Sequence, residues 1–525
     1  MSTWLALALP ALHLQLAQRA FDPALARTLA LAVVDGPAQR STVRYCSATA
    51  QAAGVQPGMK LAAAQALAGA LLSVEYAPAR ETEALQELAC WAYQFSPAIE
   101  RFTAPGCSGV VLETGASERL FGGPRALRQR ITRGLHRLGY QASDASAPTL
   151  AAARILATAR AGGHTLTDVA DLHALPAALG ALPLSILDWE PATLQTLHTL
   201  GVDTIGEVLA LPRDAFARRF GPQRLLELDR LLGLQPTPQA SFIPPERFLA
   251  RIELPADLSE VERLLVPLQR LLQSLEGFLR GRGMGATALL LRAWHNPRRA
   301  VPTEPTRVAL ALAVAERDPQ RLLRLYTERL ARVRLPEPAI VLELELAGMA
   351  PWVATSTSFL PPAPQDGTQG IDALQLAQTL HARLGSEGVF QLQSVSDHRP
   401  EHAYRQLPLG PGTPQAAPVA PTPAQRPLLI LPTPLPLPTP RQAEGESRQD
   451  PQPTSPSTTL PRYAGPLELL AGPERIEAGW WDLATPGRTS VHRDYFVARN
   501  RQGQTLWIYR EMAAPQRWFL QGYFA

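Results

Sequence analysis

The sequence predicts an α+β protein of several domains, with a disordered proline-rich linker and a small C-terminal β-containing domain. Three observations support this fold class. Strand and helix patterns interleave over residues 1–160, a purely helical stretch continues to residue 234, and a second interleaved unit covers residues 246–348. With 525 residues and 46% hydrophobic content, the chain is long enough for three or four domains with real cores.

Composition excludes several classes of protein. Lys60 is the single lysine among 50 basic residues, so the chain is rich in arginine, which suits phosphate contacts but locates no site. Cys46, Cys90 and Cys107 lack the close spacing of a zinc site or a disulfide framework, so we expect neither a metal nor a cofactor. The apolar N-terminal stretch has no basic region before it, and no segment reads as a membrane span. These features predict a cytoplasmic location.

Residues 1–165 are predicted to form the first domain. Leu5, Leu7 and Leu9 alternate with smaller residues, as in a buried strand, and the apolar run within Gly109–Glu113 predicts a second buried strand. Between them, Ala50–Met59 reads as a short helix followed by a Pro-Gly turn. Interleaved strands and helices favour a layered α/β arrangement.

Residues 166–240 are predicted to be helical. The stretch 197–208 has the form of a helix, a turn at Gly201, and a second helix that begins at Thr204 and includes Gly206. This is the helix-hairpin-helix pattern, in which backbone N–H groups at the turn meet a DNA phosphate. An ordinary helical hairpin remains the alternative.

Residues 241–350 read as strand, helix, strand, strand, helix and strand, which is a split βαβ arrangement. Basic side chains gather near the end of its first helix and its central hairpin, namely Arg280, Arg282, Arg298 and Arg299. They could follow a nucleic-acid backbone, and a solvated basic rim is the alternative.

The C-terminal part is predicted to have three segments: an extension over 351–410, a disordered linker over 411–461, and a small domain over 462–525. Fourteen of the 50 residues from 411 to 460 are proline, which is typical of such linkers. The last segment is rich in aromatic residues, which would form either a small core or a base-stacking platform.

The order of these parts resembles a Y-family translesion DNA polymerase, with palm and fingers, a helix-hairpin-helix thumb and a split βαβ little finger. Ala50–Met59 and Val110–Gly123 resemble two of the family's motifs. The resemblance implies a right-hand fold and two metal ions held by carboxylates. The positions that would carry these carboxylates fall on neutral residues, Ala8, Pro10, Cys107 and Ser108. The sequence contains no Asp-x-Asp and no adjacent Asp-Glu pair.

The positions of two triphosphate contacts in the finger motif also fall on neutral residues, Ala48 and Gln51. Loss of metal ligands together with phosphate contacts indicates that the fold is retained and the chemistry is lost. The alternative is an active Y-family translesion polymerase with divergent metal ligands, for which Glu113 and Glu118 are the nearby carboxylates.

A narrower resemblance is to the polymerase-like subunits of bacterial damage-inducible mutagenesis complexes. It rests on the neutral palm, the stretch His398–Glu401, the linker and four tail motifs, around Arg475, Trp480, Asp494 and Phe519. It implies a non-catalytic adaptor in damage-induced mutagenic translesion synthesis. The implied partners are DNA, the replication sliding clamp, an error-prone C-family DNA polymerase and a RecA-like subunit, with no membrane.

A candidate clamp-binding peptide fits that role, namely Gln406, Leu407, Pro408 and Leu409. Such peptides use a glutamine at the rim of a pocket and spaced apolar side chains in a groove. Gly410 stands where a bulky apolar residue is expected, which would reduce affinity. A DNA-binding protein without a clamp role is the remaining alternative.

Overall fold

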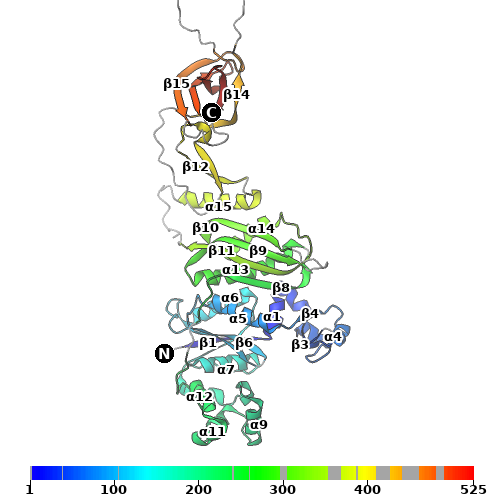
Figure 1. Ribbon diagram of the computed structural model, residues 1–525. Helices are drawn as coiled ribbons and strands as arrows, with labels where there is room; N and C mark the ends of the chain where they lie inside the picture. The colour runs from blue at the N-terminus through cyan, green and yellow to red at the C-terminus, as the bar shows by residue number, and fades with distance from the viewer. Residues whose placement is uncertain are drawn as a thin grey trace, which may run out of the picture. The chain divides into compact units, whose positions relative to one another are not determined.

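The computed structural model divides the chain into two compact units, Met1–Gly385 and Ser386–Ala525 (Figure 1). The residues that the structure describes are 3–37, 40–104, 106–238, 242–258, 260–295, 304–352, 368–385, 388–395, 397–408, 426–439, 460–479 and 490–524. Among these residues, no helix is long and apolar enough to cross a membrane.

A four-stranded antiparallel sheet forms the centre of the predicted palm-like domain. Its strand order is β5-β6-β1-β7, with bounds Ile99–Ala104, Cys107–Glu113, Trp4–Pro10 and Ser143–Ala147. Strands β1 and β6 were expected from their apolar patterns, whereas β5 and β7 were not.

Helices cover both faces of this sheet, which explains why β1 is buried along almost its whole length. The side chains of Leu5, Leu7 and Leu9 pack with α5, Pro78–Ala92, and α6, Pro124–Leu138. The alternate side chains Trp4, Ala6 and Ala8 face α7, Leu150–Ala161, on the other side (Figure 1). Because successive side chains of a strand point to opposite faces, both sets of residues must be apolar.

The predicted finger region is a separate small sheet inserted between α1, Leu12–Gln18, and α5. Its strand order is β3-β2-β4, with bounds Thr42–Cys46, Leu31–Asp35 and Leu72–Glu75. Short helices accompany it: α2, Pro23–Thr28; α3, Ala48–Ala52; and α4, Leu61–Leu67.

The predicted thumb region is helical, as expected. It contains α8, Leu175–Gly180; α9, Pro191–Thr199; α10, Ile205–Leu209; α11, Arg213–Phe220; and α12, Pro222–Leu231. Its apolar side chains continue the core on the α7 face of the palm-like sheet.

The predicted little-finger region is a four-stranded antiparallel sheet with the order β10-β9-β11-β8. In chain order its elements are β8, Leu249–Leu258; α13, Leu265–Arg280; β9, Met284–His295; β10, Thr306–Glu316; α14, Pro319–Leu330; and β11, Ala339–Pro351. The split βαβ order is therefore present. Its core extends to Phe21 and Cys90 of the palm-like domain.

The predicted extension over 351–410 is not one element. Helix α15, Thr368–Leu384, belongs to the first unit, and the hairpin of β12, Phe390–Ser394, and β13, Tyr404–Pro408, belongs to the second. The second unit also contains a five-stranded sheet of order β14-β18-β17-β16-β15. Its strands are Leu429–Leu437, Trp518–Tyr523, Thr505–Glu511, Val491–Arg499 and Glu468–Ala478.

The predicted linker over 411–461 needs correction, because β14 lies within it. This strand has the sequence LILPTPLPL and pairs with β18 through Leu429–Tyr523 and Leu435–Leu520. A strand with three prolines is acceptable here because β14 stands at the edge of the sheet, where half of the backbone N–H groups face no partner strand. The parts of the linker at 411–425 and 440–459 lie outside the described residues.

Candidate functional site

The strand register brings the four neutral palm positions to one end of the sheet. Pro10 pairs with Cys107, and Leu9 pairs with Ser108, across the two central strands. Ala8 follows in register and pairs with Gly109. The four residues named from the sequence therefore lie on adjacent strands, at the place where the implied metal ions would need ligands.

This end of the sheet is apolar on the α7 face. Ala8 is 0% exposed and Cys107 is 7% exposed, and both belong to one apolar cluster with Phe102. A side chain at Gly109 would meet the Phe102 ring, since an added Cβ would lie 2.7 Å from it. Burial raises the pKa of the Cys107 thiol to about 11, so it is neutral at physiological pH.

Glu81 is the acidic side chain that sequence reasoning missed. It comes from the first turn of α5. Burial raises the pKa of its carboxyl group, and hydrogen bonds from the His13 backbone N–H and the Ser108 hydroxyl oppose that effect. Ser108 alternates with Cys107 along β6, so Glu81 lies on the opposite face from Ala8. Nothing in its sequence position marks it, because only the fold brings α5 to β6.

Glu113 and Glu118 were considered as substitute ligands because they are close in sequence. The structure places Glu113 at the far end of the seven-residue strand β6, opposite Trp4. That is about 20 Å from Cys107 for an extended strand. The Glu113 carboxylate accepts a hydrogen bond from the Ala116 N–H at 3.3 Å. Across the described part of the chain, no group of three or more His, Cys, Asp or Glu side chains is placed to hold a metal ion.

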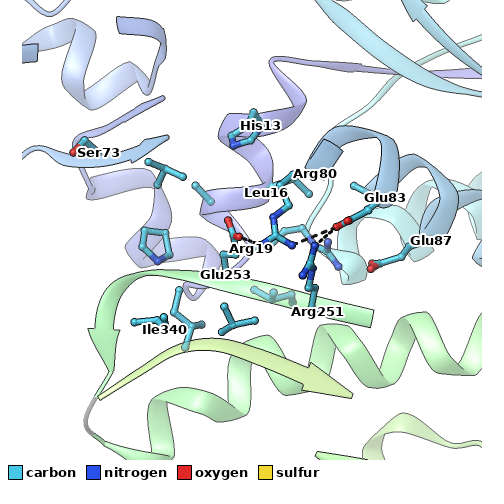
Figure 2. Close-up of a pocket in the computed structure, with 17 residues that line it drawn as sticks. His13, Leu16, Arg19, Ser73, Arg80, Glu83, Glu87, Arg251, Glu253 and Ile340 are labelled. Atoms are coloured by element: carbon cyan, nitrogen blue, oxygen red, sulfur yellow. Dashed lines mark hydrogen bonds and ion pairs between the residues drawn. The ribbon is translucent and has the colours of Figure 1, made fainter. Parts of the chain in front are cut away.

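A cavity of about 310 Å³ lies where α1, α5, β4 and β8 meet. Figure 2 shows acidic and basic side chains from α5 and β8 pointing toward one another across it. Arg80 forms ion pairs with Glu83 and Glu253, and Arg251 pairs with Glu83 at 2.6 Å. These pairs join the palm-like helix α5 to the first strand of the little-finger-like sheet.

Glu83 and its neighbour Glu87 titrate differently in this cavity. Burial alone would raise the pKa of Glu83, but Arg251 and Arg80 outweigh it and lower the pKa. Burial raises the pKa of Glu87 to about 7, and the charge of Arg19 opposes this only in part. Glu87 is therefore a group whose charge changes near neutral pH.

The thumb hairpin has the predicted helix–turn–helix shape, but backbone N–H groups at its turn donate hydrogen bonds to a side chain of the hairpin itself. Gly201 has a φ of +74°, which favours glycine. Thr204 caps α10, and the Glu207 carboxylate accepts the N–H groups of Asp203 and Thr204 at 2.8 and 2.9 Å. An added Cβ at Gly206 would lie 3.0 Å from the Gly180 carbonyl oxygen, so Gly206 serves close helix packing. A phosphate at this turn would have to displace Glu207.

The arginines predicted to contact DNA differ in the partners that their side chains already have. Arg280 pairs with Glu276 at 2.7 Å and its side chain is 46% exposed. Arg282 donates hydrogen bonds to the carbonyls of Pro245 and Phe278, and its guanidinium lies 3.6 Å over the Phe278 ring. Arg298 and Arg299 lie outside the described residues.

The candidate clamp-binding peptide forms strand β13 of a two-stranded hairpin. Gln406 pairs with Leu392 and is exposed, while Leu407 pairs with Gln391 and is half-buried. Pro408 ends the strand. Leu409 and Gly410 lie outside the described residues.

A half-buried ion pair joins the segment before β13 to the five-stranded sheet of the second unit. Glu401 accepts a hydrogen bond from Arg493 at 2.9 Å and another from Gln521 at 3.5 Å. Burial alone would lower the pKa of Arg493, but Tyr495 and Glu401 outweigh it and raise the pKa. Arg399, which is 1% exposed, pairs with Asp397 at 2.7 Å.

The aromatic side chains of the tail form a core. Tyr495 and Trp507 stack with their ring centres 4.4 Å apart, and Tyr509 stacks on Phe519 at 5.1 Å. Tyr495, Trp507 and Tyr509 are each at most 2% exposed. The core alternative is therefore correct for these residues, which are too deeply buried to stack on bases.

Comparison with known proteins shows which proteins the chain is similar to. Residues 13–158 match the model of the impB/mucB/samB family. Protein ImuB of Caulobacter vibrioides, from two strains, is 28% identical over 490 residues, which cover 90% of this chain and all of that protein.

Solved structures of Y-family polymerases overlap the chain loosely. DinB from Sulfolobus solfataricus and an insertion ternary complex of Dbh DNA polymerase are each 13% identical. Each covers 66% of this chain and 98% of its own, with TM-scores of 0.33 and 0.36. The assignment therefore rests on the family match, the curated relatives and the order of domains described above. Together these make the chain ImuB-like: it is similar to ImuB over 90% of its length, and residues 13–158 match the impB/mucB/samB family.

Proposed function

We propose that this protein is a non-catalytic adaptor in damage-induced mutagenic translesion DNA synthesis. The observation that carries the proposal is the apolar end of the palm-like sheet. Ala8, Pro10 and Cys107 occupy adjacent register positions there, and Ser108 follows on the opposite face. The family match and the similarity to ImuB support a role related to DNA damage.

The residues present at this end do not fit the two metal ions that Y-family chemistry requires. Magnesium prefers carboxylate and water oxygens in near-octahedral geometry. The α7 face offers a methyl group, a proline ring, a neutral thiol and the Phe102 ring. Glu81 lies on the opposite face, beside Ser108. We therefore derive no nucleotidyl transfer step for this protein.

Primer extension tests the absence of catalysis. The purified full-length protein is expected to extend no primer with either Mg²⁺ or Mn²⁺, beside an active Y-family polymerase as the positive control. The alternative function, an active polymerase with divergent ligands, predicts metal-dependent extension that is lost in Glu113→Gln or Glu118→Gln. Such extension would overturn the adaptor proposal.

We also propose that β13 provides the contact with the replication sliding clamp. The strand is already extended, and Gln406 is exposed. An extended segment loses less conformational entropy on binding than a free peptide does. In a clamp pull-down, the double variant Gln406→Ala/Leu409→Ala is expected to lose binding, and Gln391→Ala on the paired strand β12 is the matched control. Equal retention of wild type and double variant would favour a DNA-binding protein without a clamp role.

The remaining partners in this proposal are DNA, an error-prone C-family DNA polymerase and the RecA-like subunit ImuA, all in the cytoplasm. Several weak attachments along one chain raise the effective concentration of each partner at the others. Co-purification of each partner with the full chain, and then with a chain truncated after residue 408, tests whether the five-stranded sheet of the second unit recruits any of them. Recruitment that is unchanged by truncation would remove this part of the proposal.

A further inference from the structure

A groove of about 340 Å³ lies between α6 of the palm-like domain and α13 of the little-finger-like domain. Trp91 of α5, together with Gln94 and Phe95 just after that helix, contributes to its lining. The side chains along its two edges are polar or charged, namely Arg130, Arg133 and Arg137 of α6 and Gln273, Glu276 and Arg280 of α13. It is separate from the strand ends of the palm-like sheet and from the thumb hairpin.

Close packing fixes the two sides of this groove. Trp91 is 5% exposed and lies against a glycine on each helix. An added Cβ at Gly134 of α6 or at Gly277 of α13 would lie only 2.3 Å from the Trp91 ring. Glycine at both positions lets the two helices approach the indole, so the arginines are held opposite α13.

The charge of the groove is largely unbalanced. Arg130, Arg133 and Arg137 are exposed, and within the described residues no carboxylate lies within 4.0 Å of them. Glu276 is the one acidic side chain in the lining, and it pairs with Arg280. The buried Oε1 of Gln273 has no hydrogen-bond partner within the described part of the chain. The α6 arginines therefore present N–H donors and positive charge without a counterion in the groove, whereas the Gln273 Oε1 is an acceptor and adds no donor.

We propose that this groove binds the phosphate backbone of single-stranded nucleic acid. From Arg130 to Arg137 the arginines follow one face of α6 for about 10 Å. That length reaches two or three consecutive phosphates, which follow one another by about 3.4 Å or more along a strand. Guanidinium groups bind phosphate oxygens in a bidentate manner. This inference extends the DNA binding in the proposed function and rests on it only for the kind of ligand.

Geometry favours a single strand over the two other polyanions. A groove of about 340 Å³ is too small to hold a duplex, whose major groove alone is about 12 Å wide. An acidic peptide would find little apolar surface to bury, because Trp91 and Phe95 on the floor are almost fully covered. Repeated phosphates need only the exposed guanidinium groups.

Fluorescence anisotropy with labelled oligo(dT) and the full-length protein tests the proposal. The triple variant Arg130→Gln/Arg133→Gln/Arg137→Gln is expected to bind about tenfold or more weakly, and the slope of log K against log salt should fall by about 2. Glu276→Gln should tighten binding about two- to fivefold, because it releases Arg280. The matched control, Arg324→Gln/Arg332→Gln/Arg334→Gln, removes equal charge from exposed positions elsewhere in the first unit.

The outcomes separate this inference from the function it extends. No binding of oligo(dT) by the wild-type protein would overturn both. Wild-type binding that the triple variant retains, or that the control variant loses equally, would overturn the groove alone. Equal competition by a polyglutamate of matched charge, or preference for a duplex, would overturn the assignment to single strands. Loss in the triple variant with tightening in Glu276→Gln supports it, and the opposite signs exclude a general folding defect.

Discussion

The palm-like sheet and the second unit differ in their charged side chains. The sheet is apolar around Ala8 and Cys107, whereas the second unit contains ion pairs such as Glu401–Arg493. At the palm end, Ala8 and Cys107 lie on the paired strands β1 and β6. Their side chains belong to the apolar cluster that includes α7. In the second unit, Glu401 and Arg493 form an ion pair that links a loop to a sheet.

The difference shows what keeps each region folded. A buried charge is stable only when a partner and hydrogen bonds replace its water. Asp494, whose side chain is 2% exposed, has two such partners, Arg475 at 2.9 Å and Arg510 at 3.5 Å. The palm end has none on the α7 face, so only neutral side chains are compatible with its packing. Charge joins parts of the chain in the second unit, whereas the α7 face of the palm-like sheet around Ala8 and Cys107 is apolar.

The sharpest way to break this comparison is to place a carboxylate at the palm end. Ala8→Asp is expected to lower the free energy of unfolding by about 3–5 kcal/mol, because position 8 is 0% exposed and offers no cation. Urea unfolding followed by circular dichroism measures this effect. Ala8→Ser is the milder control. An Ala8→Asp protein as stable as wild type would show that the site has room for a charged ligand.

Removing one partner of the half-buried Glu401–Arg493 pair tests the other side of the comparison. Arg493→Ala should lower the free energy of unfolding by about 2–4 kcal/mol, because Glu401 is left without its cation. Hydrogen exchange at Tyr404–Pro408 should rise, since Glu401 fixes the segment leading into β13. A double-mutant cycle compares the losses of unfolding free energy in Glu401→Ala, Arg493→Ala and the double variant. If the two single losses simply add, the ion pair does not stabilise this segment.

A third test uses pH to compare paired and unpaired carboxylates in the cavity. The pKa of Glu87 is raised to about 7 in the folded state. The folded state therefore binds its proton more tightly than the unfolded state does. The corresponding stability is present below about pH 4.5 and is lost as pH rises to about 7.

Glu87→Gln should remove this dependence and raise the free energy of unfolding at pH 7.5 by on the order of 1–2 kcal/mol. The gain over wild type should shrink toward pH 4.5. Thermal unfolding at several pH values measures it, with Glu83→Gln as a control that should instead destabilise, since Glu83 is paired with Arg251. A gain that does not change with pH would contradict the assignment.

The smallest expected effect concerns the thumb hairpin. Thr204→Ala should cost about 1 kcal/mol of stability through loss of the capping box. The Glu207 carboxylate already accepts hydrogen bonds from the N–H groups at this turn, so they are not available to a phosphate. The affinity of the protein for oligo(dT) should therefore change less than twofold. A large loss of affinity without a loss of stability would instead show that Thr204 contacts the nucleic acid directly.

The elements that sequence reasoning found are those with strong apolar patterns, such as β1, β6 and the two strand–helix units of the little-finger-like domain. Strands β5 and β7 were missed because their sequences, IERFTA and SDASA, carry few apolar residues and owe their place to neighbours. Strand β14 was missed because its prolines are typical of a linker. Proline is tolerated in an edge strand, and composition does not show that a strand lies at an edge.

The candidate sites divide in the same way. The clustering of Pro10, Cys107 and Ser108 was predictable from the resemblance, because strand pairing follows from the fold. Glu81 and the groove between α6 and α13 were not, because each depends on helices that meet only after folding. The arginines of α6 are ordinary surface residues in the sequence, and it is Trp91 between two glycines that places them opposite α13.

The position of β14 has a practical consequence for dividing the protein. The first strand of the five-stranded sheet is β14, Leu429–Leu437, and the next begins only at Glu468, so the sheet begins well before residue 462. A fragment that starts at residue 462 would lack β14 and leave the backbone of β18 without its neighbour. Exposed strand edges pair with other chains. Such a fragment is expected to aggregate, whereas one that starts before residue 426 keeps the sheet covered.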